Sequence, residues 1–279
     1  MFQKIFRITP TNREILEKGL PKDLSESFQK TRSEQLEIPP NVILVLIPAF
    51  NEEGSIGGVI LRVPKTACGL NTQVIVINDG STDNTSSIAK AAGALTLEMP
   101  RNSGQGAALK AGYLFALQNR SRFVAVVDGD GQWDPSDLNE MMAPIINGEA
   151  DFAQGSRRLG STEVDDPLRN LGVEFFTRLI SFLVGMPVGD SSSGYRAYNA
   201  DTLAKVRLKQ SQYQSAEILI SAMCNGARLH EHPVKMSPRT AGVSKKAANW
   251  KYGIYYLRAV VQTALRDRYL ARLITSTGR

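Results

Sequence analysis

Short runs of apolar, largely β-branched residues alternate with segments of helical spacing through most of the chain. Unbroken apolar runs of this length, bounded by Gly, Pro, Asn or Asp, are typical of strands buried on both faces of a parallel sheet. Short loops join the strands to the helical segments, as in βαβ units with right-handed crossovers. The sequence therefore predicts an α/β fold with a doubly wound, mainly parallel sheet. Its strands are expected at Val42–Ile47, Val74–Ile77, Ala94–Glu98, Phe123–Val127 and from Phe152.

Polar loops follow the predicted strands at the points where the strands end. The most acidic of them, Asp128-Gly129-Asp130, follows the apolar run that starts at Phe123. Because ligands of such folds bind outside the carboxyl ends of the strands, we expect these loops to converge on one site. Two carboxylates one residue apart can share a divalent cation, with Gly129 letting the backbone bend and Gln132 adding a third oxygen. A solvated Asp-Gly turn is the alternative interpretation.

The two ends of the chain differ from its middle. Residues 1–40 are polar and of mixed charge, so we expect a poorly ordered extension or, alternatively, a partner-binding arm. From Trp250 to Leu270 the spacing predicts an amphipathic helix that packs on the domain or contacts a membrane or a partner. The predicted division is an extension over 1–40, a compact domain over 41–248 and a C-terminal helix over 249–279.

Composition narrows the class of protein and of partner. Of the 279 residues 42% are hydrophobic and 22% charged, as in ordinary globular domains, and the formal net charge of +6 favours anionic partners. Two cysteines are too few for a disulfide framework, which indicates a reducing compartment. The N-terminus lacks the apolar core of a signal peptide, and no run of about 18 apolar residues could span a membrane. Basic and aromatic residues do not interleave on any one element, so nucleic-acid binding is not expected.

Seven motifs that occur in order between residues 42 and 246 carry a family resemblance. They are IPAFNEEGSIGGVI, VIVINDGSTDNT, NSGQGAALKAGY, VVDGDGQWDP, FAQGSRR, DSSSGYRAY and HEHPVKMSPRTAGVSK. In these motifs the chain resembles the family 2 inverting glycosyltransferases, in the branch of polyprenyl-phosphate sugar transferases that includes dolichyl-phosphate mannose synthases. The resemblance implies a fold of the nucleotide-sugar glycosyltransferase A type and a metal-dependent enzyme.

The resemblance further implies a donor site at the ends of the first strands. Asp79 is expected to accept a hydrogen bond from the nucleotide base. Asp128 and Asp130, with Gln132 as a third ligand, are expected to hold Mg²⁺ or Mn²⁺ against the diphosphate of the donor. The implied nucleotide contacts are Pro48, Ala49, Asn51, Glu52, Asp79, Gly106, Lys110, Asp128 and Gly129.

Residues further along the chain are implied to act on the acceptor. The basic loop from Lys235 to Lys246 is predicted to be a lid, with Arg239 contacting donor and acceptor phosphates together. Asp190 leaves two alternatives open. With a phosphate acceptor it orients neighbouring groups or places Arg196, whereas with a hydroxyl acceptor it is the best candidate general base. Glu217 matches an acidic position that faces the site. The implied catalytic residues are Asp130, Asp190 and Arg239, and the implied acceptor or phosphate contacts are Arg157, Arg169, Arg196 and Lys246.

A predicted helix over Leu168–Met186 places apolar residues on one stripe. Such a stripe packs into a core or lies in a membrane interface, and the resemblance implies the second role. The stripe consists of Phe175, Leu179, Phe182, Leu183 and Met186.

The expected function is inverting transfer of a hexose or N-acetylhexosamine from a GDP- or UDP-linked sugar to a polyprenyl phosphate. Direct attack by the lipid phosphate on the anomeric carbon requires no covalent sugar–enzyme intermediate. We expect a protein peripheral to the cytoplasmic face of a membrane, docked by surface helices, as a homo-oligomer or through an anchoring partner. Two alternatives stay open: a glycosyltransferase with a soluble hydroxyl acceptor, and a non-catalytic sugar-nucleotide-binding or scaffold protein.

Overall fold

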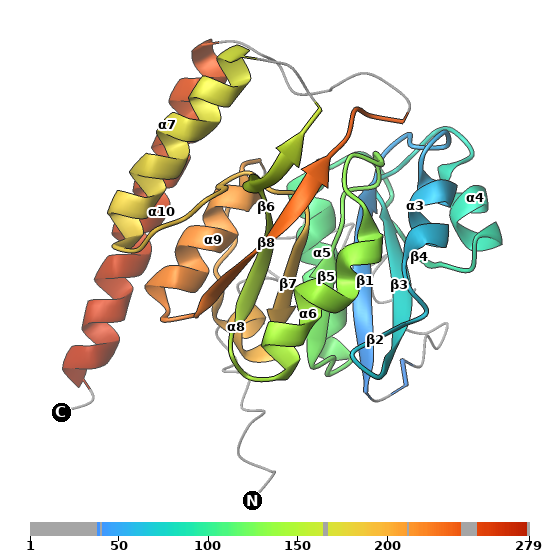
Figure 1. Ribbon diagram of the computed structural model, residues 1–279, viewed down its shortest axis with the longest axis horizontal. Coiled ribbons are helices and arrows are strands. Elements are labelled where there is room, and N and C mark those ends of the chain that lie inside the picture. The colour runs from blue at the N-terminus through green and yellow to red at the C-terminus, as the bar shows by residue number, and fades with distance from the viewer. Residues whose placement is uncertain (1–37, 40, 164–166, 211, 241–249, 278–279) are drawn as a thin grey trace, which may run out of the picture.

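The computed structural model describes residues 38–39, 41–163, 167–210, 212–240 and 250–277 (Figure 1). Side chains are described for all of these except 167–169, 250–252 and 269–277. Most of the predicted extension over 1–40, the side chain of Arg169, and Lys246 of the predicted lid therefore lie outside the described residues.

One mixed sheet forms the centre of the molecule (Figure 1). Its strands are β1 (Val42–Ala49), β2 (Thr66–Ala67), β3 (Leu70–Asn78), β4 (Leu95–Glu98), β5 (Phe123–Val126), β6 (Phe152–Thr162), β7 (Arg196–Asn199) and β8 (Leu229–Met236). They lie in the order β2-β3-β1-β5-β7-β6-β8, and β4 also pairs with β3. β1 is parallel to β3 and β5, β3 to β4, and β6 to β8. β7 is antiparallel to both β5 and β6, and β2 to β3.

Helices cover both faces of this sheet. They are α3 (Ile56–Arg62), α4 (Thr85–Ala91), α5 (Gln105–Gln118), α6 (Leu138–Ile146), α7 (Pro167–Val184), α8 (Ala200–Lys205), α9 (Gln214–Cys224) and α10 (Trp250–Thr277), with a 3₁₀ turn η1 (Pro135–Asp137) before α6. Alternate residues of β1 enter two apolar clusters. Leu44 and Leu46 belong to the cluster that includes residues of α5, α9 and α10, whereas Val45 and Ile47 belong to the cluster that includes residues of α3 and α6. Burial on both faces explains why β1 is an unbroken apolar run.

The predicted α/β fold with a mainly parallel sheet is confirmed, and all five predicted strands are present. The sequence did not predict β7. This strand has four residues, Arg-Ala-Tyr-Asn, so it lacks the apolar run that marks a central parallel strand. It nevertheless lies between β5 and β6, where Arg196 pairs in register with Val126 and Gln154.

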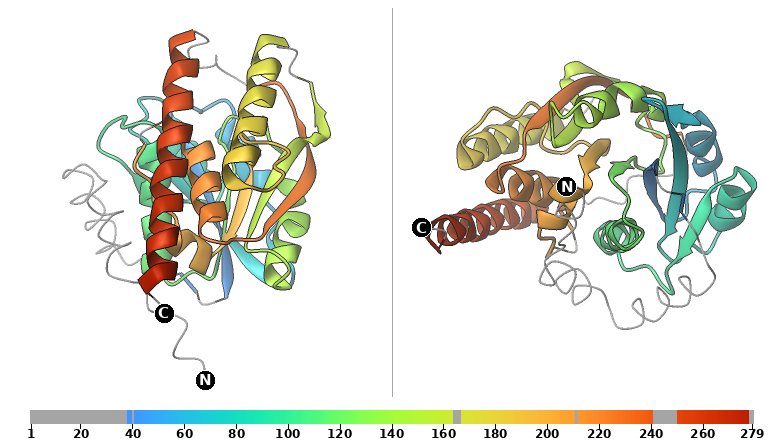
Figure 2. Two further views of the ribbon diagram at one scale, coloured as in Figure 1. Left: turned by 90° about the vertical axis from the view of Figure 1, so that its left-hand side faces the viewer. Right: turned by 90° about the horizontal axis from the view of Figure 1, so that it is seen from below.

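Helices α7 and α10 lie side by side at one end of the molecule (Figures 1 and 2). The rings of Phe176 and Tyr256 join them with centroids 4.4 Å apart. The apolar stripe predicted on α7 is only partly buried. Its members Phe175 and Phe182 are 56% and 79% exposed. Among the described residues, no helix is both long enough and apolar enough to cross a membrane. The members of the stripe that pack against the core are Leu179, Leu183 and Met186.

Candidate functional site

The loop after β5 closes against the end of β1. A Cβ on Gly129 would lie 3.1 Å from the carbonyl oxygen of Pro48, and Ser55 Oγ donates to the carbonyl oxygen of Gly129 at 2.8 Å. Glycine at this position lets the two backbones approach. The contact holds Asp128 and Asp130 at the carboxyl edge of β1, β3 and β5, the edge at which the sequence predicted a site.

Asp128 is held by residues from two distant segments. Gln105 Nε2, in the first turn of α5, donates to Asp128 Oδ1 at 2.8 Å. Gly194 approaches Asp128 Oδ2 so closely that a Cβ there would overlap this oxygen, and it would also lie 2.5 Å from Trp133 Nε1. The indole of Trp133 is 3% exposed. Asp128 is therefore closely packed on the side that faces Gly194 and Trp133.

Asp130 contacts the loop after β8. Its Oδ1 accepts from the backbone N–H of Gln132 at 3.0 Å, and its Oδ2 lies 2.9 Å from Arg239 Nη2. Arg239 Nη1 lies 3.6 Å from Glu52 Oε1, so the guanidinium bridges carboxylates from the loops after β5 and β1. The backbone N–H of Thr240 donates to the carbonyl oxygen of Asp130 at 3.3 Å. These contacts place Arg239 beside Asp130, at the carboxyl ends of β1 and β5. We call this region, with Asp128 and Asp130, the acidic edge.

The acidic edge offers hard oxygen ligands. Within the described residues, no group of three or more His, Cys, Asp or Glu side chains could hold a metal. Asp128 and Asp130 supply carboxylate oxygens, the type of ligand that Mg²⁺ or Mn²⁺ binds together with diphosphate or water oxygens. Gln132, the predicted third ligand, donates its Nε2 to the carbonyl oxygen of Ser237 at 3.4 Å, and so also anchors the loop after β8.

The loop after β8 begins later than predicted, because β8 extends to Met236. Lys235 belongs to β8, where its ammonium group pairs with Glu163 at 2.7 Å. The irregular segment begins after Met236, because β8 continues its pairing with β6 up to that residue.

The loops after β1 and β3 are bonded to each other. The backbone N–H of Asn51 donates to Ser81 Oγ, and the backbone N–H of Thr82 donates to Asn51 Oδ1, both at 2.9 Å. The backbone N–H of Glu52 donates to Thr85 Oγ1 at 2.8 Å. Of the predicted nucleotide contacts, Pro48 and Ala49 are therefore the last residues of β1, and Asn51 and Glu52 lie in the linked pair of loops that follows.

Asp79 is buried directly after β3. Its two carboxylate oxygens accept from the backbone N–H groups of Ser103 and Gly104, each at 2.8 Å. Burial raises the pKa of Asp79, and these two hydrogen bonds oppose that shift. Asp79 therefore fastens the loop before α5, and with it Gly106, to the sheet. The predicted bond to a nucleotide base would add to these contacts.

Lys110 and Glu217 lie in the packed interior rather than on an open site. Lys110 is 4% exposed on α5; burial lowers its pKa, and the nearby Glu217 carboxylate acts in the opposite direction. Glu217 on α9 accepts from the backbone N–H groups of Lys209 and Gln210, each at 2.9 Å, and pairs with Arg266 of α10 at 3.0 Å. The expectation that Glu217 faces the site is wrong, because these donors enclose its carboxylate and make it a tie between α9 and α10.

Arg157 and Asp190 form a buried bidentate pair. Arg157 Nε donates to Asp190 Oδ2 at 2.6 Å, and Nη2 donates to Oδ1 at 2.7 Å. The Asp190 oxygens also accept from the backbone N–H groups of Arg157 at 3.2 Å and Ser192 at 3.0 Å. The guanidinium carbon of Arg157 lies 5.8 Å from the centre of the Trp133 ring, and Nη1 lies 3.5 Å from Met236 Sδ. The side chains of Arg157 and Asp190 are 10% and 2% exposed.

Arg196 has a different position from the one its predicted role requires. It is 3% exposed at the start of β7, and its Nη2 donates to the carbonyl oxygen of Ser193. Its Nε has no hydrogen-bond partner among the described residues. A side chain enclosed in this way does not present its guanidinium to an acceptor, and Asp190 places Arg157 instead of Arg196.

Four residues that contact Asp128 or the segment of Asp190 were not predicted as site residues. Their contacts join segments that lie far apart in the sequence, so spacing gave no signal for these roles. All four residues do stand inside the family motifs, which was the available signal. The four residues are Gln105, Trp133, Gly194 and Glu231.

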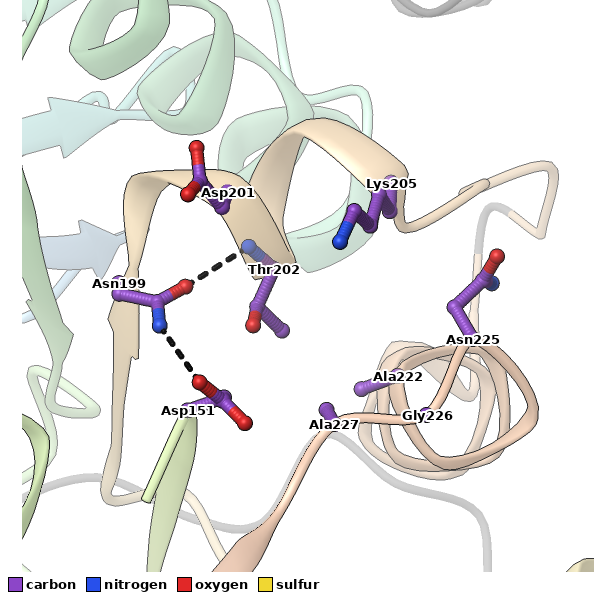
Figure 3. Close-up of a pocket in the computed structure, with 9 residues that line it drawn as sticks. All are labelled: Asp151, Asn199, Asp201, Thr202, Lys205, Ala222, Asn225, Gly226 and Ala227. Carbon is purple, nitrogen blue, oxygen red and sulfur yellow. Dashed lines mark hydrogen bonds between the residues drawn. The ribbon is translucent and has the colours of Figure 1, made fainter. Parts of the chain in front are cut away.

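A separate hollow of about 140 Å³ lies at the opposite edge of the sheet, between α8 and the end of α9 (Figure 3). Asp151 on its wall accepts from Asn199 Nδ2 at 3.1 Å and from Arg228 Nε at 2.9 Å. The hydrogen bonds from Arg228 lower the pKa of Asp151 to about 2. Asn199 in turn caps α8 by accepting from the backbone N–H of Thr202 at 2.8 Å. These groups are engaged in holding the fold, so the acidic edge is the better candidate for chemistry.

Comparison with known proteins agrees with the motifs. Residues 44–207 match the family described as glycosyl transferase family 2. A polyprenol monophosphomannose synthase of Mycolicibacterium smegmatis is 30% identical over 226 residues, which cover 76% of this chain and 83% of that protein. A UDP-N-acetylglucosamine–dolichyl-phosphate N-acetylglucosaminyltransferase of Methanococcus voltae is 30% identical over 219 residues, which cover 70% of this chain and 85% of that protein.

The fold also has solved counterparts. Glucosyl-3-phosphoglycerate synthase from Mycobacterium tuberculosis, in complex with Mg²⁺ and uridine diphosphate, superposes with a TM-score of 0.61 at 19% identity, covering 88% of this chain and 83% of that one. At this identity the likeness shows the glycosyltransferase A type fold. With the family match and the two relatives, it follows that the chain belongs to glycosyltransferase family 2 and is a glycosyltransferase, in the polyprenyl-phosphate sugar transferase branch that its motifs indicated.

Proposed function

We propose that this glycosyltransferase transfers a hexose or N-acetylhexosamine from a GDP- or UDP-linked sugar to a polyprenyl phosphate, with inversion at the anomeric carbon. The observation that carries the proposal is the buried pair of Asp190 and Arg157. It favours an acceptor that arrives already ionised. The names of the two relatives, one a polyprenol and one a dolichyl-phosphate enzyme, support the same acceptor class.

A hydroxyl acceptor needs a general base, and Asp190 was the best candidate for that role. Its two oxygens already accept five hydrogen bonds, two of them from the Arg157 guanidinium, and its side chain is 2% exposed. A carboxylate in this setting can take a proton only after it gives up a charge-assisted bidentate contact. A phosphate acceptor carries its negative charge at neutral pH and needs no base. The geometry therefore favours the phosphate.

Arg157 is the residue that we assign to the acceptor phosphate. Its Nε and Nη2 are bonded to Asp190, and Nη2 also donates to Ser192 Oγ at 2.5 Å. Its Nη1 contacts Met236 Sδ, a weak acceptor that a phosphate oxygen can replace. The guanidinium is thus fixed in orientation while one of its nitrogens stays available, which is the preorganisation that phosphate recognition requires.

Arg239 is assigned to the donor diphosphate because it lies at the acidic edge beside Asp130 and Glu52, with 22% of its side chain exposed. A divalent cation held by Asp128 and Asp130 would neutralise charge that develops on the leaving diphosphate. The residues of the chain then orient the two substrates, so that a phosphate oxygen attacks the anomeric carbon from the face opposite the leaving group. Inversion follows from this single displacement.

A lipid acceptor requires contact with a membrane, and the paired helices offer a surface for it. Leu171, Phe175 and Phe182 on α7, with Ile254 and Leu265 on α10, are each more than half exposed. Exposed apolar residues on amphipathic helices, in a chain of net charge +6, suit peripheral binding to a membrane with anionic lipids. We place this contact at the cytoplasmic face.

The test is turnover with Mg²⁺ or Mn²⁺, a polyprenyl phosphate in vesicles containing anionic lipid, and a panel of GDP- and UDP-sugars. Asp130→Ala is the matched inactive control. Lipid-linked sugar that forms with the wild type and disappears in the control supports the proposal and identifies the donor. The anomeric configuration of the product tests inversion.

Other results lead elsewhere. Donor hydrolysis or transfer to a soluble hydroxyl, with no lipid product from any donor, refutes the phosphate acceptor and restores the soluble acceptor. A chain that binds no donor at all supports the non-catalytic alternative.

A further inference from the structure

We propose that Glu231 is a positioning residue, which sets the Asp190–Arg157 pair for the acceptor phosphate through backbone N–H groups. The inference rests on the proposed function, because it gives Arg157 the role of acceptor contact. Glu231 lies in the last of the seven motifs, but nothing in that motif marks it as a site residue. It stands between His230 and His232 in β8, where the alternation of a strand places its side chain on one face of the sheet.

The carboxylate of Glu231 is enclosed by three N–H donors. Its Oε2 accepts from the backbone N–H of Gly189 at 2.6 Å, and its Oε1 accepts from the backbone N–H of Asp190 at 3.1 Å. Its Oε1 also accepts from Gln154 Nε2, across the β6–β8 pair, at 2.9 Å. Two successive backbone N–H groups directed at one carboxylate fix the path of the chain at Gly189 and Asp190.

The close approach depends on glycine at position 189. A Cβ on Gly189 would lie 2.8 Å from Glu231 Oε2 and 3.0 Å from Oε1, both shorter than an ordinary contact. The segment after α7 can therefore rest on Glu231 only because residue 189 has no side chain. This gives a second way to disturb the same contact, from the other side.

The contacts form a relay from β8 to the acceptor site. Glu231 holds the backbone of Asp190, the Asp190 carboxylate holds the Arg157 guanidinium in a bidentate pair, and Arg157 presents Nη1. Within the described residues, no hydrogen bond joins Glu231 directly to Arg157. Glu231 therefore acts on the acceptor through another residue, and a shift of the Asp190 backbone turns the guanidinium away from its bound orientation.

The first variant is Glu231→Gln. The amide keeps the size of the side chain but directs an NH₂ group at one of the two backbone N–H donors, so that a donor faces a donor. We expect the KM for polyprenyl phosphate to rise about tenfold, since misplacement of a positioning group by about 1 Å can cost up to 100-fold. The Kd for the nucleoside diphosphate is expected to stay unchanged, because in the part of the chain that the structure describes Glu231 bonds to Gln154, Gly189 and Asp190 and not to the acidic edge.

A double-mutant cycle separates positioning from general support of the fold. If Glu231 acts only through Arg157, then Glu231→Gln added to Arg157→Ala raises the KM for polyprenyl phosphate no further. A merely structural role predicts that the two effects multiply. Gly189→Ala is expected to reproduce the acceptor-specific rise in KM, which keeps the inference testable if Glu231→Gln does not fold.

Glu163→Gln is the matched control. Glu163 follows β6 directly and pairs with Lys235 of β8, but its side chain is 50% exposed and the pair lies on the surface. The KM and kcat of the Glu163→Gln enzyme are expected to equal those of the wild type. If the wild type makes lipid-linked sugar while Glu231→Gln and Gly189→Ala leave the KM unchanged, or if the cycle is multiplicative, the inference about Glu231 is overturned. A wild type that makes no lipid product refutes the proposed function instead.

Discussion

Replacing Gly194 by alanine tests the packing behind the acidic edge. Gly194 lies just before β7, and a Cβ there would overlap Asp128 Oδ2 and stand 2.5 Å from Trp133 Nε1. Neither neighbour is free to yield, because Trp133 is 3% exposed and Asp128 is held by Gln105. The φ angle of Gly194 is outside the left-handed region, so the backbone itself accepts alanine. The expected effect therefore comes from the added methyl group alone.

The size of the effect follows from these distances. Trp133 Nε1 must retreat by about 1 Å to reach an ordinary van der Waals contact with the methyl group, and Asp128 must move further. Misplacement of about 1 Å at a reacting site can lower kcat about 100-fold. Overpacking of a filled interior costs about 1–3 kcal/mol of unfolding free energy. We expect Gly194→Ala to lose most of its turnover while remaining folded.

The assay combines turnover with thermal unfolding and with titration of Mn²⁺ plus nucleoside diphosphate. Gly58→Ala is the matched control, because Gly58 lies in α3 with open space where its Cβ would be. That control is expected to keep the wild-type kcat and to gain up to about 1 kcal/mol of stability from the better helix former. A Gly194→Ala protein with wild-type kcat would show that Asp128 has room to move, and the packing argument would fail.

Three further predictions concern groups that support the fold. Lys110→Met is expected to raise the unfolding free energy by about 1 kcal/mol, seen as a Tm increase of about 2–4 °C, because it removes a buried charge; weakened nucleotide binding would instead restore Lys110 to the donor site. Arg266→Ala removes the guanidinium that pairs with the buried Glu217 carboxylate and is expected to cost about 3–5 kcal/mol in urea unfolding, so a loss below about 1 kcal/mol would contradict the tie between α9 and α10. Arg228 lowers the pKa of Asp151 to about 2, so this pair stabilises the fold at neutral pH and loses that contribution as the pH falls from about 4 to 2. Asp151→Asn is therefore expected to show a smaller loss of Tm over that range than the wild type, and equal losses would contradict the assignment.

Much of the fold could be predicted because the strands that build it are unbroken apolar runs. Val42–Ala49 is buried at all eight positions, so its sequence carries the signal of a central parallel strand. The position of Asp128 and Asp130 then followed from topology, since the carboxyl ends of parallel strands share one edge. β7 gave no such signal, because its pairing depends on neighbours rather than on its own four residues.

The roles of individual residues were harder to predict than their presence. Arg157 and Asp190 were both chosen as site residues, but that they bond each other could not be read from positions 33 apart. Glu217 was expected to face the site because it matches an acidic position of the resembled family, and nothing in the local sequence shows that Arg266 of α10 covers it. Carboxylates and guanidinium groups look alike in a sequence whether they bind a substrate or each other, and only the packing of distant segments distinguishes the two.

Arg157 and Arg239 show how that distinction bears on mechanism. Both guanidinium groups pair with carboxylates, but the pairs differ in what the carboxylate can do. Asp190 is 2% exposed and accepts five hydrogen bonds, two of them from the Arg157 guanidinium, so it holds Arg157 in one orientation. Asp130 lies at the edge that suits a divalent ion, and the Arg239 side chain, 22% exposed, lies 2.9 Å from Asp130 and 3.6 Å from Glu52. On the proposed function the two arginines would have different tasks: Arg157 would orient the acceptor phosphate for attack, and Arg239 would contact the donor diphosphate, whose charge changes during the reaction.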